Sequence, residues 1–237
     1  MGCGALELTL QLELNMIHTR SLSLLQASVF TACAVFATTS QAASFQFDEA
    51  GDGDLSGNVL APTLFGSSPS SLGFAVGSNT ISGQTSSGDY DLINFTVGAG
   101  QQLSAIKLVS YSSTDVRGFI AVQEGAVWAN GLGGAGNFDV STLLGYSHFG
   151  THVQAPQPGT DVLDNLGASV AGGAIGFSGP LGPGSYTFLI QQTGPAVISY
   201  GFDFQLTAVP EPGESVAMAG LLLGGFGVWR RLRRHRA

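Results

Sequence analysis

The stretch DLINFTVGAGQQLSAIKLVSY, residues 91–111, decides the fold class. Ile93, Phe95 and Val97 fall on one side of an extended chain, and the residues between them fall on the other. Such period-two alternation is typical of a β-strand. The glycine-containing residues 98–101 predict a turn, and a second alternating run follows at residues 103–111. This part of the chain therefore predicts two successive strands.

Similar short runs recur on both sides of this stretch, at residues 72–76, 79–84, 118–123, 143–149, 185–192 and 197–206. In the last run, the apolar residues of one face are Ile198, Tyr200, Phe202, Phe204 and Leu206. Gly, Pro, Ser and Asn separate the runs, and no helical period is evident between the two terminal segments. About eight short strands in this arrangement predict an all-β sandwich over residues 43–207, with long loops at residues 126–140 and 153–173.

A family resemblance rests on three consecutive motifs, GSNTISG at residues 77–83, GDYDLINFTV at residues 88–97 and AGQQL at residues 99–103. Residues 52–125, with a closing strand at residues 184–192, resemble the bacterial pre-peptidase C-terminal (PPC) domain. The resemblance implies a jelly-roll-like β-sandwich that serves exported proteins as a binding or processing accessory. No protease domain accompanies it in this sequence.

The C-terminal tail has three parts in order. Pro210, Glu211 and Pro212 come first, an apolar segment predicted to be a transmembrane helix at residues 215–229 follows, and an arginine-rich end occupies residues 230–237. The uncharged residues 216–229 would span roughly 21 Å as a helix, which is short against a bilayer core of about 30 Å. The expected membrane-stop residues are Arg230, Arg231, Arg233 and Arg234, which the positive-inside bias places in the cytoplasm.

This order of parts resembles the PEP-CTERM sorting signal of Gram-negative envelope proteins. The resemblance implies recognition by an exosortase, a membrane-embedded cysteine protease, and cleavage near residues 210–212. The chain would then span the inner membrane only transiently, before it reaches the cell surface or an extracellular matrix.

The N-terminal residues 1–42 read as an extension followed by a secretory signal peptide. Arg20 precedes an apolar stretch, and Ser40-Gln41-Ala42 supplies the small residues that signal peptidase requires, so we expect cleavage before Ala43. Met16 is the expected start of translation. Both cysteines, Cys3 and Cys33, precede this cleavage point, so the exported domain is expected to contain no disulfide and no thiolate site.

The domain between the two terminal segments is strongly acidic. Residues 43–209 hold twelve Asp and Glu against Lys107 and Arg117, which gives a net charge of −10. Such a surface repels nucleic acid and attracts cations. The composition therefore argues against a nucleic-acid partner.

Calcium is the one cofactor that the sequence suggests. In the run DGDLSGN, residues 52–58, oxygen-bearing side chains alternate as in the first half of an EF-hand loop. The expected ligands are Asp52, Asp54, Ser56 and Asn58, with Asp48 and Glu49 as further candidates. The alternative is an acidic surface turn, because Asp and Gly favour turns.

A second acidic pair, Asp89 and Asp91, flanks Tyr90 at a strand start. In an extended chain both carboxylates point to one face and could complete a cation site with a loop. The alternative is an edge strand kept charged against edge-to-edge pairing.

No catalytic motif is evident, so the sequence predicts a non-enzymatic structural or binding protein. The alternative function is that of a secreted accessory or hydrolytic protein acting on extracellular polysaccharide. Trp128, Tyr146 and Phe149 are the aromatic residues that could stack on sugars, although aromatics in a sandwich usually form the core.

Overall fold

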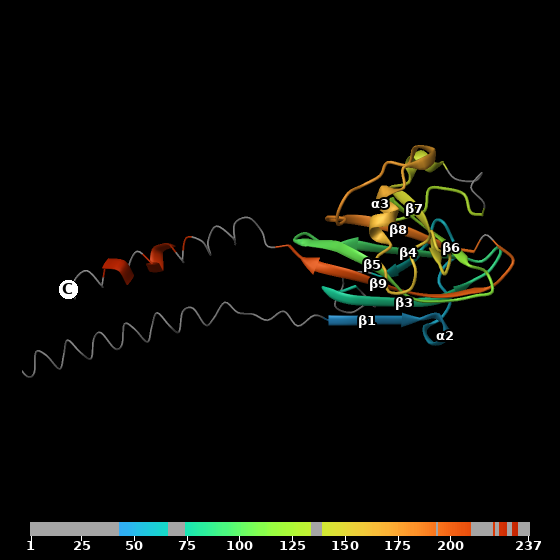
Figure 1. The fold of residues 1–237 in the computed structure, drawn as a ribbon, viewed down its shortest axis with the longest axis horizontal. Coiled ribbons are helices and arrows are strands. Elements are labelled where there is room, and N and C mark those ends of the chain that lie inside the picture. Colours follow the sequence, from blue (N-terminus) through green and yellow to red (C-terminus); the bar gives the residue numbers. More distant parts are fainter. Residues whose placement is uncertain are drawn as a thin grey trace, which may run out of the picture. The chain divides into compact units, whose positions relative to one another are not determined.

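The computed structural model describes residues 43–65, 74–133, 139–192 and 194–209, and the tail residues 220, 223–226 and 229–231. Within these ranges nine strands form two sheets (Figure 1). The four-stranded sheet has the order β1-β3-β9-β5, with bounds Ala43–Asp48, Gly77–Thr85, Ile198–Ala208 and Gln101–Ser112. The five-stranded sheet has the order β2-β4-β8-β6-β7, with bounds Thr63–Phe65, Tyr90–Val97, Gly184–Gln191, Arg117–Glu124 and Gly145–Gly150. The all-β prediction is confirmed.

From β1 to β6 each strand lies in the opposite sheet from the strand before it. Strand β1 pairs with β3, and β2 pairs with β4, in parallel. All other pairings are antiparallel. The two early strands therefore each add a parallel edge to an otherwise antiparallel sheet.

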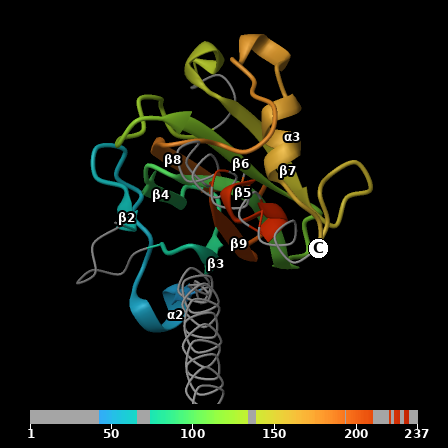
Figure 2. The same ribbon diagram turned by 90° about the vertical axis from the view of Figure 1, so that its left-hand side faces the viewer.

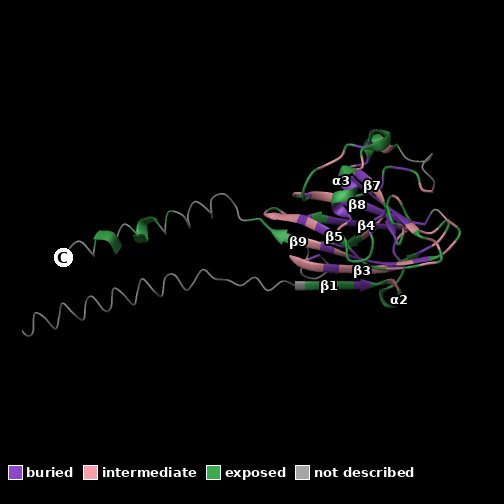
Figure 3. Ribbon diagram, viewed as in Figure 1, coloured by how far each residue is buried: buried purple, intermediate pink, exposed green. Residues whose placement is uncertain are grey.

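The core lies between the two sheets. The alternating residues of β9 are at most 2% exposed, as the sequence predicts. The Phe204 ring packs edge-on against Phe95 and Phe188 of the opposite sheet, with centroids 5.6 and 5.4 Å apart. Each such ring contributes about 1.5–3 kcal/mol by its burial. Figure 3 shows that buried residues are concentrated in the strands.

Strand β5 departs from its predicted alternation. Register shifts between Leu103 and Ala105 and between Leu108 and Ser110 interrupt its pairing with β9. A β-bulge inserts an extra residue and so changes which side chains point inward. Leu103 would lie on the opposite face from Ile106 and Leu108 in a regular strand, yet all three are buried.

Although the sequence shows no helical period between the terminal segments, short helices occur there. Two short α-helices, α2 (Glu49–Asp52) and α3 (Leu163–Ala168), and the 3₁₀ turns η2 (Val140–Thr142) and η3 (Ala171–Gly173) occur there. Figures 1 and 2 show α2 beside β3 and α3 beside β7. The prediction of a strand at residues 72–76 is wrong for residues 74–76, which belong to no strand. Residues 72 and 73 lie outside the described residues.

Of the predicted terminal segments, residues 1–42 and the PEP motif at 210–212 lie outside the described residues. The described tail residues have helical backbone. No helix within the described part of the chain is long and apolar enough to cross a membrane. The predicted signal helix and the transmembrane helix at 215–229 therefore stay predictions.

Candidate functional site

The N-terminal segment, residues 43–58, is held against both sheets by hydrogen bonds. Strand β1 pairs in parallel with β3, and Asp48 caps α2 by accepting a hydrogen bond from the Ala50 N–H. The chain then reaches β4, where the Leu92 N–H donates to the Ser56 carbonyl at 2.9 Å. This route brings the acidic residues of the segment to the start of β4.

Glu49 fixes this segment through both of its carboxylate oxygens. Oε1 accepts from the Leu55 N–H at 2.9 Å, and Oε2 accepts from the Gln84 N–H at 2.7 Å. Gly83 makes the second contact possible, because a Cβ there would lie 2.6 Å from the Glu49 Oε2 and 2.8 Å from the Tyr200 hydroxyl. The Glu49 carboxylate therefore occupies space that a side chain at position 83 would fill.

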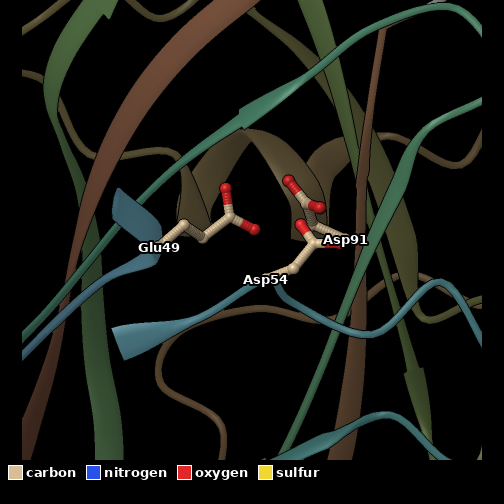
Figure 4. A group of neighbouring side chains, drawn as sticks. All are labelled: Glu49, Asp54 and Asp91. Atoms are coloured by element: carbon tan, nitrogen blue, oxygen red, sulfur yellow. The ribbon is translucent and has the colours of Figure 1, made fainter. Parts of the chain in front are cut away.

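Three carboxylates meet at this position (Figure 4). Glu49 of α2, Asp54 of the following loop and Asp91 of β4 each place one oxygen within 4.8 Å of the other two. Asp54 is exposed, Glu49 is half-buried and Asp91 is fully buried. We call these three residues the acidic cluster.

Asp91 is the least solvated member. It lies on the same side of β4 as Ile93 and Phe95, so its carboxylate points between the sheets at one end of the core. Its Oδ2 accepts from the Tyr200 hydroxyl of β9 at 2.7 Å, whereas its buried Oδ1 has no hydrogen-bond partner. An unpaired buried oxygen costs about 1–3 kcal/mol.

Burial shifts the ionisation of the cluster. Desolvation, with the nearby charges of Glu49, Asp89 and Asp54, raises the pKa of Asp91 from 3.8 to about 8, although the Tyr200 hydrogen bond opposes this. Burial likewise raises the pKa of Glu49, against its two backbone hydrogen bonds. The pKa of Tyr200 is raised by its complete burial and by Asp91.

The structure divides the six predicted calcium ligands into two groups. Glu49 and Asp54 enter the acidic cluster. The remaining four make local backbone bonds: Asp48 caps α2, Asp52 accepts from the Asp48 N–H, the Ser56 hydroxyl donates to the Ala61 carbonyl, and Asn58 accepts from the Leu60 N–H. Asp48 and Asp52 are therefore not members of the acidic cluster, whereas Asp91, predicted as part of a possible cation site with a loop, is a member.

The other predicted site residues are placed as follows. Arg230 and Arg231 are exposed and helical, while Pro210, Glu211, Pro212, Arg233 and Arg234 lie outside the described residues. Trp128 and Phe149 are 1% and 0% exposed, so the idea that they stack on sugars is wrong. Tyr146 is half-buried and donates its hydroxyl to the Ala171 carbonyl.

Comparison of the chain with protein-family models, with curated proteins and with solved structures finds no match.

Proposed function

We propose that this protein is an exported β-sandwich protein of the cell surface or extracellular matrix, with a structural or binding role. A signal peptide would direct its export, and an exosortase would process its C-terminal tail. The sequence signals at the two ends of the chain are the basis of this proposal.

One structural observation supports it. Among the described residues, strand β1 covers Ala43–Asp48 and strand β9 ends at Ala208, two residues before Pro210. Neither expected cleavage point therefore lies within a described strand. Processing at these points would remove none of the nine described strands.

The finer fold assignment belongs to the same proposal. We infer a jelly-roll-like sandwich of the PPC type, because the three sequence motifs fall at β3, at β4 and at the start of β5. The antiparallel pairing of β3 and β5 with β9, and of β4 and β6 with β8, is consistent with a two-sheet sandwich.

The acidic cluster favours a binding role over hydrolysis. Glycoside hydrolysis uses two carboxyl groups about 5–10 Å apart on either side of a bound sugar. Here the three oxygens lie within 4.8 Å of one another, and both Glu49 oxygens already accept backbone hydrogen bonds. This geometry suits a shared small cation better than a polysaccharide between two carboxylates.

The test is intact mass and cell fractionation of the chain expressed in hosts with and without an exosortase. The proposal expects loss of residues 1–42 in both hosts, and loss of the arginine-rich end with surface release only where the exosortase is present. A Glu211→Ala variant, which alters the PEP motif alone, should keep the tail in the membrane. Retention of the tail by the unaltered chain in both hosts would overturn the sorting proposal.

A further inference from the structure

The spacing of the acidic cluster matches the coordination sphere of a single cation. Ca²⁺ binds oxygen at about 2.3–2.6 Å, so two oxygens on one ion lie no more than about 5 Å apart. The ligand oxygens of Glu49, Asp54 and Asp91 lie within 4.8 Å of one another. Figure 4 shows the three carboxylates converging from different segments of the chain.

A second and independent observation is the unpartnered oxygen of Asp91. This side chain is 0% exposed, and its Oδ1 has no hydrogen-bond partner, although its other oxygen is held by Tyr200. Buried carboxylates are normally paired or bind metal ions. An oxygen left free beside two further carboxylates is a ready ligand for a positive ion.

The charges around the cluster are not balanced by basic side chains. Four groups affect the ionisation of Asp91. They are Glu49 of α2, Asp54 of the loop after α2, Asp89 of the turn before β4, and the hydroxyl of Tyr200 in β9. No lysine, arginine or histidine of the described residues contributes to this environment. A divalent cation would supply the missing positive charge.

We propose that Glu49, Asp54 and Asp91 bind one Ca²⁺ ion, which fastens the N-terminal segment to the sandwich. The ligands are all oxygens, which suit hard cations, and their convergence from a helix, a loop and a strand suits the irregular geometry that Ca²⁺ accepts. Water completes the sphere on the side of the exposed Asp54. With three protein ligands we expect a dissociation constant of about 10⁻⁴ to 10⁻³ M, as in extracellular modules.

The ion would connect three parts of the fold. Glu49 and Asp54 belong to the N-terminal segment, Asp91 belongs to β4 of one sheet, and Tyr200 links Asp91 to β9 of the other sheet. Binding at this point joins residues far apart in the sequence. The inference does not depend on export or on tail processing.

The experiment is calorimetric titration of the full chain, in mild detergent and stripped with EDTA, with CaCl₂. Asp54→Asn and Asp91→Asn remove one ligand charge each, and Asp52→Asn, at the last residue of α2 and outside the cluster, is the matched control. We expect one Ca²⁺ per chain, at least about tenfold weaker binding in the two cluster variants because each loses a ligand, and about unchanged binding in the control. Asp54 is exposed, so its variant remains informative if Asp91→Asn fails to fold.

Two results would overturn the inference. One is a folded wild-type chain, verified by circular dichroism, that binds no Ca²⁺ up to 10-fold above the expected range, or about 10 mM. The other is loss of binding in Asp52→Asn with retention in Asp54→Asn, which would place the ion in the loop of residues 52–58 instead. Sorting of the tail can fail in cells while this titration succeeds, so the two proposals are separable.

Discussion

A rise in pH should lower the free energy of unfolding of this protein, and Ca²⁺ should raise it. The pKa of Asp91 is about 8 in the folded chain against an ordinary value of 3.8, so between these values the folded state holds one proton more than the unfolded state. The free energy of unfolding then falls as pH rises, by about 1.36 kcal/mol per pH unit. The stabilising contribution is fully present below pH 3.8 and is lost by about pH 8.

The magnitude is large compared with the stability of a domain. Over the range from pH 5 to pH 8 the loss is about 4 kcal/mol, against a total of about 5–15 kcal/mol for a typical protein. The raised pKa values of Glu49 and Asp89 act in the same direction just above their ordinary ranges. Outward movement of the N-terminal segment would expose Asp91 to water. The measured loss of unfolding free energy should therefore be smaller than about 4 kcal/mol.

Calcium should reverse part of the loss, because the ion binds the ionised form of Asp91. At 10 mM, about 10 to 100 times the expected dissociation constant, it would add about 1.4–2.7 kcal/mol to the stability of the folded state. The assay is urea unfolding at pH 5, 6, 7 and 8, in EDTA and in 10 mM CaCl₂, for the wild-type chain and for Asp91→Asn. Equal pH dependence in the two chains in EDTA would refute the assignment of the effect to Asp91.

Three further changes test the site and the core. Gly83→Ala should weaken Ca²⁺ binding at least about tenfold in a titration, because its Cβ displaces the Glu49 carboxylate from its seat; unchanged affinity would contradict the geometry. Tyr200→Phe leaves both oxygens of Asp91 without a donor and should lower the free energy of unfolding in EDTA by about 1–3 kcal/mol, less in Ca²⁺. Phe204→Ala empties the contact between the sheets and should cost about 3–5 kcal/mol in urea unfolding, while a chain that still folds keeps its Ca²⁺ affinity.

Much of the sandwich is predictable from the sequence because its strands obey period two. In β9 every second residue from Ile198 to Leu206 is buried, and in β4 the alternation assigns Ile93 and Leu92 to opposite faces, each packed in a different cluster. The bulges of β5 are not predictable in this way, since an extra residue leaves no periodic signal. Helix α3 is six residues long, too short to display a helical period.

The acidic cluster could be predicted only in part. The alternation of β4 places Asp91 on the face of Ile93, which indicates a carboxylate directed at the core. That Glu49 and Asp54 are its neighbours depends on the parallel pairing of β1 with β3 and on the bond between Ser56 and Leu92. These contacts join residues more than thirty positions apart, and no local pattern specifies them.

The edge position of β1 explains why a cation would matter at this place. Of its residues 44–48, Phe47 is buried and Phe45 is half-buried, and both rings pack against Phe65. After β1 the segment is held by the hydrogen bonds of Glu49 and by the buried side chain of Leu55, whereas Asp54 is exposed. A Ca²⁺ ion that joins Glu49 and Asp54 to Asp91 would fix this edge segment to β4, a strand of the opposite sheet.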